Sequence, residues 1–159
     1  MRFLSVDPSV NDVGLAFFNS ETDKLRTWTF RPLRNGRNTT NIAIQILRFI
    51  LTVCLQGEKR PDYLVMEHPQ WENSDRGHKA AAKGYTLDLA YLIGFIGGSM
   101  GLAGNKIHTP TPREWKGNMP KSATEHRVKA RFGPMKVTDH EFDAAGLILW
   151  LIGDLEEQG

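Results

Sequence analysis

The sequence predicts an α/β fold in which helices flank a mixed β-sheet, and three observations lead to this prediction. Residues 1–30 contain three short, mainly apolar runs separated by turn residues. From residue 40 the apolar positions recur at helical spacing, and strand-like and helix-like patterns then alternate along the chain. The 159 residues match the size of one domain, because an average domain has about 150 residues. We therefore expect a single domain over residues 1–159.

The first three strands are expected over residues 3–7, 13–19 and 25–30. The connections between them are short, so they should form an antiparallel meander. A helix is expected over residues 40–57; Cys54 lies on its apolar stripe and should be a small core residue. Residues 63–67 are almost continuously apolar, as a central parallel strand would be.

The second half of the chain should add a long helix over residues 78–100 and a short fifth strand over residues 106–109. Two capping-box patterns then mark helix starts, one from Ser122 to Glu125 and one from Thr138 to Glu141. The predicted order is three strands, helix, strand, helix, strand and two helices.

Composition excludes several classes of protein. Hydrophobic residues make up 40% of the chain and charged residues 24%, which is typical of a globular protein and excludes a disordered or fibrous one. The densest apolar stretch, residues 89–98, is too short to cross a bilayer, which needs about 20 residues. The N-terminal residues lack the long apolar run of a signal peptide. One cysteine excludes a disulfide within the chain and a zinc site of several cysteines. A cytoplasmic protein is therefore expected.

Charge is unevenly distributed along the chain. Residues 106–136 contain 8 Lys and Arg against 2 Asp and Glu, whereas residues 137–159 contain 6 acidic residues and no Lys or Arg. A basic block beside an acidic segment indicates a polyanionic partner next to a carboxylate-rich centre. Two solvated surfaces of opposite sign would give the same pattern.

Asp7 and Glu67 are expected to lie near one another, because each closes a strand that we predict to be parallel to the other. Functional groups in open α/β sheets gather at the carboxyl ends of such strands. Two close carboxylates repel each other unless a cation joins them, and oxygen ligands suit Mg²⁺. The alternative is a pair of strand-terminating acids that face water.

The last predicted helix supplies two more candidates. His140 and Asp143 are three residues apart, so they share one face of the helix. Glu141 belongs to the capping box and Asp139 favours the helix N-terminus electrostatically, so both have structural roles. His140 and Asp143 have no such role, and we predict them to be metal ligands. A surface histidine at a helix end is the alternative for His140.

Four segments resemble, in order, motifs of the RuvC-type Holliday junction resolvases of the ribonuclease H-like superfamily. They are residues 6–9 (V-D-P-S), 12–16 (D-V-G-L-A), 64–67 (L-V-M-E) and 140–147 (H-E-F-D-A-A-G-L). Ser9 stands where the family usually has glycine, and the segment after Glu67 is unlike the common cellular version. The resemblance implies a ribonuclease H-like fold with a five-stranded mixed sheet of order 3-2-1-4-5. It also implies four metal-binding catalytic residues, Asp7, Glu67, His140 and Asp143.

The function implied by this resemblance is that of a metal-dependent DNA endonuclease. Such an enzyme resolves Holliday junctions or related branched DNA by paired nicks, with two Mg²⁺ ions in each active site, and leaves 5′-phosphate and 3′-hydroxyl ends. A histidine ligand suggests that Mn²⁺ also supports activity. The alternative is a non-catalytic module that binds branched DNA and keeps the fold. Intact acidic positions favour the nuclease, because a pure binder gains nothing from negative charge facing DNA.

Several residues are expected to contact DNA. Lys116 and Lys121 match lysines that the resemblance places near the scissile phosphate, and Arg113 is a weaker candidate; the alternative is a solvated basic loop. A Gly- and Asn-rich loop carries Arg31, Arg34 and Arg37, which suggest a second phosphate-contacting surface. Trp71 either stacks on unpaired bases or packs back onto the domain.

A homodimer is expected from the helix over residues 89–100, which is apolar around its whole circumference. One sheet face buries only one stripe of a helix, so the rest needs another partner. Gly94, Gly98 and Gly101 would let a second backbone approach closely. The near two-fold symmetry of a four-way junction also favours two copies. The alternative is a buried helix covered by the C-terminal helix.

Overall fold

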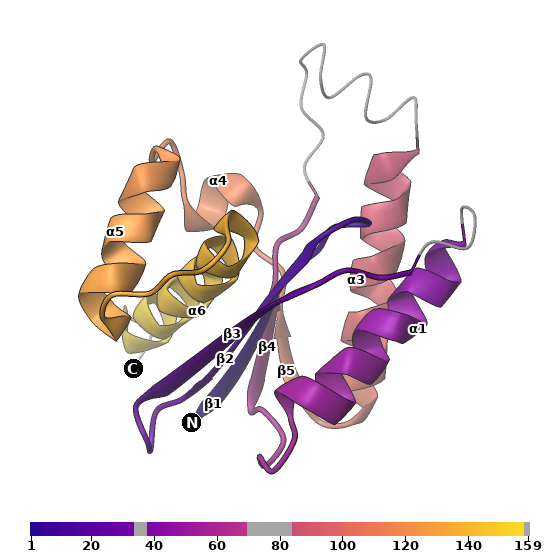
Figure 1. The fold of residues 1–159 in the computed structure, drawn as a ribbon, viewed down its shortest axis with the longest axis horizontal. Coiled ribbons are helices and arrows are strands. Elements are labelled where there is room, and N and C mark those ends of the chain that lie inside the picture. The colour runs from indigo at the N-terminus through magenta and orange to yellow at the C-terminus, as the bar shows by residue number, and fades with distance from the viewer. Residues whose placement is uncertain (34–37, 70–83, 158–159) are drawn as a thin grey trace.

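A computed structural model describes residues 1–33, 38–69 and 84–157. Its centre is a five-stranded sheet of order β3-β2-β1-β4-β5, as predicted (Figure 1). β2 pairs antiparallel with β1 and β3, whereas β4 pairs parallel with β1 and β5. The strands are β1 (Arg2–Asp7), β2 (Val13–Asn19), β3 (Lys24–Phe30), β4 (Tyr63–Met66) and β5 (Lys106–His108).

Helices cover both faces of the sheet. One face carries α1 (Thr39–Phe49) and α3 (Tyr85–Leu102), and the other carries α4 (Pro112–Trp115), α5 (Lys121–Phe132) and α6 (Asp139–Glu157) (Figure 1). Alternate residues along a strand point to opposite faces, so β1 contributes Leu4 and Val6 to the first core and Phe3 to the second. The sheet therefore separates two hydrophobic cores.

The helix predicted over residues 40–57 is shorter and changes type. The α-helix ends at Phe49 and continues as a π-helix over Ile50–Cys54, in which the amide of Leu55 donates to the carbonyl of Ile50 at 3.0 Å. Cys54 is buried, as expected, and desolvation raises the pKa of its thiol to about 12.

Helix starts in the second half differ from the predictions in two places. The capping box predicted at Ser122 is wrong: α5 begins at Lys121 after Pro120, which makes no side-chain cap, and Glu125 instead pairs with Lys129. The short helix α4 was not predicted, although Thr111 and Glu114 form a capping box at its start. Residues 78–83 of the predicted long helix lie outside the described residues.

Helix α3 buries one side and exposes the other. Leu92, Ile96 and Met100 are among its buried residues. The opposite side, here called the α3 outer stripe, consists of exposed, uncharged residues: Leu87, Tyr91, Gly94, Gly98 and Leu102. Helix α6 lies on the other face of the sheet (Figure 1), so the alternative in which the C-terminal helix covers this helix is wrong. No helix in the described parts of the chain is long and apolar enough to span a membrane.

Candidate active site

The four predicted metal ligands come from three elements that meet at one edge of the sheet. Asp7 is the last residue of β1 and Glu67 directly follows β4. Because β1 and β4 are parallel neighbours with Val6 opposite Met66, the two acidic residues leave the sheet at the same edge. His140 lies in the first turn of α6, and its Nδ1 is 2.8 Å from Oδ2 of Asp7.

Close packing fixes the start of α6 over β1 and β2. A Cβ atom added to Gly14 of β2 would lie 2.0 Å from the carbonyl oxygen of His140, so only glycine leaves room for the helix. The buried hydroxyl of Ser5 in β1 donates to the carbonyl of Ala144 in α6 at 2.6 Å. Sequence reasoning missed both contacts. The available signals were Ser5, a polar residue in an otherwise apolar strand, and Gly14, a glycine within a strand.

Glu141 anchors the same helix to β3. Its buried carboxylate accepts hydrogen bonds from the hydroxyls of Thr27 at 2.5 Å and Thr29 at 2.8 Å. The amide of Glu141 donates to the hydroxyl of Thr138 at 3.3 Å, as a capping interaction requires. The assignment of a structural role to Glu141 agrees with these contacts, although its side chain reaches β3 as well as the cap residue.

Lys116 lies among the acidic side chains. Its Nζ is 3.4 Å from Oε2 of Glu67 and 3.8 Å from Oδ2 of Asp143, and 29% of the lysine side chain is exposed. The indole of Trp115 donates to the same Glu67 oxygen at 2.6 Å. Asp143 therefore faces the same group of side chains as Glu67, joined to it through the lysine.

The electrostatics indicate a site that favours a cation. Burial raises the pKa of Glu67 and of Asp143, and in both cases Lys116 opposes the rise while the charge of Asp7 adds to it. The hydrogen bond to Asp7 raises the pKa of His140. The Asp7 carboxylate thus destabilises the charged forms of Glu67 and Asp143, and added positive charge would relieve this repulsion.

The donor set fits Mg²⁺ chemically, because Asp7, Glu67 and Asp143 offer carboxylate oxygens at one place. Within residues 1–33, 38–69 and 84–157, however, no three His, Cys, Asp or Glu side chains are already arranged to hold a metal ion. The ammonium of Lys116 contacts two of the acids. The lysine thus supplies positive charge beside Glu67 and Asp143 in this structure.

The structure separates the predicted DNA-contacting residues. Lys121 is exposed and pairs with Asp139 at 2.7 Å, and Arg113 is exposed. Arg31 pairs with Asp12 at 2.5 Å. Three further candidates lie outside the described residues: Arg34, Arg37 and Trp71.

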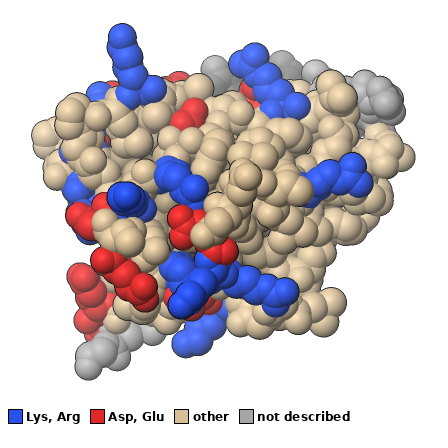
Figure 2. Space-filling model, turned by 60° about the horizontal axis from the view of Figure 1, so that its bottom comes forward, with Lys and Arg blue, Asp and Glu red and all other residues tan. Residues whose placement is uncertain are grey.

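Neither positive nor negative charge dominates the face of the molecule drawn in Figure 2. On the face drawn in Figure 2, Lys and Arg side chains lie beside Asp and Glu side chains instead of forming one basic patch. Ion pairs such as Arg2 with Asp62, 3.0 Å apart, show the same pairing of opposite charges. The mixed-sign surface agrees with the small formal net charge of +2.

No protein-family profile and no curated protein matches this sequence. Solved structures that are similar to it include those of three proteins. The RuvC protein of T. thermophilus, determined in complex with a Holliday junction substrate, is 15% identical, with a TM-score of 0.74 over 99% of this chain and 96% of that chain. The yeast mitochondrial Holliday junction resolvase Ydc2 is 10% identical, with a TM-score of 0.59 over 94% and 78%.

The third is the Holliday junction resolvase of fowlpox virus, which is 14% identical, with a TM-score of 0.51 over 98% of this chain and 99% of that chain. At these identities the likeness concerns the fold. The sheet order, the parallel pairing of β1 with β4 and the flanking helices agree with it. The chain therefore has the ribonuclease H-like fold of the RuvC-type Holliday junction resolvases.

Proposed function

We propose that this protein is a cytoplasmic, metal-dependent endonuclease that resolves Holliday junctions or related branched DNA by paired nicks. The observation that carries the proposal is the meeting of Asp7, Glu67, His140 and Asp143 at one sheet edge, with Lys116 among them. These residues come from three elements far apart in the sequence. A clustered set of acids beside a lysine is suited to hydrolysis of a phosphodiester more than to simple binding of a polyanion.

The donor set supports two Mg²⁺ ions, with Mn²⁺ as an alternative. Asp7 would contact both ions, Glu67 would hold one, and His140 with Asp143 would hold the other. When bound, such ions would activate the attacking water and stabilise the leaving 3′-oxygen, and the products would carry 5′-phosphate and 3′-hydroxyl ends.

The chain's own residues then have distinct roles. Lys116 contacts Glu67 and Asp143, so its ammonium is placed to hold the scissile phosphate and to offset the negative charge that builds in the transition state. Lys121 and Arg113 are exposed, and they would contact the DNA backbone outside the reacting centre. Its contacts with the acidic side chains distinguish Lys116 from Lys121 and Arg113.

Cleavage of a synthetic four-way junction tests the proposal. The wild-type protein should cut it with Mg²⁺ or Mn²⁺ and not with EDTA. Asp7→Asn and Asp143→Asn should abolish cutting and bind the junction at least as tightly, because each removes negative charge near phosphate. A protein that binds the junction but never cuts it would instead be a non-catalytic branched-DNA-binding module. Full turnover by both variants would refute the catalytic assignment.

We also propose a homodimer that forms through the α3 outer stripe. Leu87 is 76% exposed and Leu102 is 95% exposed, and a Cβ atom at Gly94 or Gly98 would meet nothing within 4 Å. Two copies related by a two-fold axis would place one active site on each of two opposed DNA strands.

Sedimentation equilibrium without DNA tests the dimer. The wild-type protein should have about twice the chain mass of 17.9 kDa. Leu87→Asp should give a monomer, whereas Leu51→Asp, at a residue of the π-helix that is 54% exposed, should leave the dimer intact. A wild-type mass near 18 kDa at every micromolar concentration would rule the dimer out.

A further inference from the structure

Trp115 contacts two residues of the candidate active site at once. Its Nε1 donates to Oε2 of Glu67 at 2.6 Å, and Nζ of Lys116 lies 4.6 Å from the centre of its ring. The residue is only 6% exposed. A buried indole that hydrogen-bonds a carboxylate has little freedom to move, so it restricts the Glu67 side chain as well.

Two features of the chain hold the indole in this place. Helix α4 starts with a capping box, in which the backbone amide of Thr111 donates to Glu114 at 2.6 Å, and Pro112 follows the cap. On the other side, a Cβ atom at Gly146 of α6 would lie 2.9 Å from Cζ3 of Trp115, so this glycine makes room for the ring. Both features fix the position of the Trp115 side chain.

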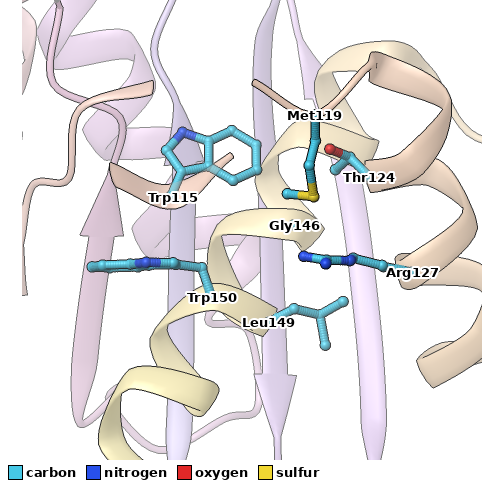
Figure 3. Close-up of a pocket in the computed structure, with 7 residues that line it drawn as sticks. All are labelled: Trp115, Met119, Thr124, Arg127, Gly146, Leu149 and Trp150. Carbon is cyan, nitrogen blue, oxygen red and sulfur yellow. The ribbon is translucent and has the colours of Figure 1, made fainter. Parts of the chain in front are cut away.

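A pocket of about 240 Å³ lies between α4, α5 and α6, and Trp115 forms part of its wall (Figure 3). Trp150 of α6 lines the same pocket. It is half-buried and packs against the same hydrophobic core as Trp115. The two tryptophans therefore share an environment, while the hydrogen bond described here belongs to Trp115.

We propose that Trp115 is a positioning residue that holds Glu67 and Lys116 in place for the reaction. The inference rests on the proposed nuclease function. Its indole N–H and the Lys116 ammonium both contact Oε2 of Glu67, so together they restrict the orientation of this carboxylate. Outer partners of this kind orient a ligand, and their removal typically lowers metal affinity or activity about 10- to 100-fold.

Trp115→Phe removes the N–H donor and keeps an aromatic ring, and Trp150→Phe is the matched control. Mn²⁺ affinity is measured by electron paramagnetic resonance, and junction cleavage by kcat and KM. Trp115→Phe should weaken Mn²⁺ binding and lower kcat, each about tenfold or more, with KM for the junction unchanged. Trp150→Phe should match the wild type in all three. Equal losses in both variants, or none in Trp115→Phe, would overturn the proposal.

A metal-free spectrum tests the hydrogen bond itself and does not require Trp115→Phe to fold. The indole N–H signals are recorded by ¹H–¹⁵N NMR and assigned with Phe variants of the other three tryptophans, Trp28, Trp71 and Trp150. Glu67→Gln should shift the Trp115 signal and leave the Trp150 signal in place. An unmoved Trp115 signal would overturn the inference. If Glu67→Gln shifts the Trp115 signal, and the wild-type protein binds Mn²⁺ but does not cut DNA, the proposed function is refuted. The positioning of Glu67 by Trp115 would still stand.

Discussion

Gly14→Ala should damage the active site although the atoms that the new methyl group overlaps most closely belong to the backbone of His140. Gly14 pairs with Asp7 across β1 and β2, and α6 passes directly over it. The added Cβ would lie 2.0 Å from the carbonyl oxygen of His140 and 2.4 Å from its carbonyl carbon. These are backbone atoms, so no change of rotamer relieves the overlap.

The size of the effect follows from that distance. Carbon and oxygen atoms that are not bonded rarely approach closer than about 3.3 Å, so the start of α6 must retreat by about 1.3 Å. Overpacking of this kind costs about 1–3 kcal/mol, and the upper end corresponds to a fall in Tm of about 6–12 °C. Misplacement of catalytic groups by 1 Å costs about 100-fold in rate. Junction cleavage should therefore fall about 100-fold in a protein that still folds.

The matched control is Gly153→Ala in α6, the helix that Gly14→Ala would displace. A Cβ atom at Gly153 would meet nothing within 4 Å, and replacing a helical glycine with alanine gains about 0.5–1 kcal/mol. This variant should melt slightly higher and cleave at the wild-type rate. Thermal melting and single-turnover cleavage of the four-way junction measure both effects. Wild-type cleavage by Gly14→Ala would show that the approach of α6 to β2 does not set the position of His140.

Three further predictions concern other parts of the chain. Lys116→Ala should lower kcat more than junction affinity, because the lysine contacts Glu67 and Asp143, whereas Lys121→Ala should only weaken binding in a salt-dependent way; equal kinetic defects would contradict this distinction. Glu141→Ala should lower the free energy of unfolding by about 2–3 kcal/mol, because it loses the hydrogen bonds to Thr27 and Thr29. Thr138→Ala, which removes the cap, should lower it by about 1 kcal/mol, and denaturant titrations measure both values. Cys54 should react with iodoacetamide at pH 8 only after unfolding, since burial raises its thiol pKa to about 12; mass spectrometry of native protein would reveal any modification.

Local patterns were sufficient for the strands and for the edge at which the candidate ligands gather, whereas the order of the five strands was implied by the resemblance to a known family. Five strands were predicted close to their observed bounds because each is a short apolar run between turn residues. Asp7 and Glu67 stand at the ends of two such runs, and parallel pairing brings them to one edge. These outcomes depend on residues that are neighbours in the sequence, so periodicity revealed them.

Contacts between distant residues were not predictable in the same way. Trp115 is 48 residues from Glu67, and Glu141 is 114 residues from Thr27. No periodic pattern links such positions, and each contact depends on how the helices settle on the sheet. Gly14 illustrates the difficulty: its motif was visible, but the need for glycine comes from the backbone of His140 above it.

The sheet acts as a partition between two halves that can change independently. Leu4, Val6 and Met66 face α1 and α3, whereas Phe3, Ser5 and Val65 face the layer that carries His140 and Asp143. Substitutions at distant, unconnected sites usually have additive effects. In the proposed dimeric nuclease, substitutions on the outer surface of α3 would therefore change the angle at which two copies meet and leave the active site unchanged. The geometry of the proposed substrate and the chemistry proposed for it would then be separately adjustable properties.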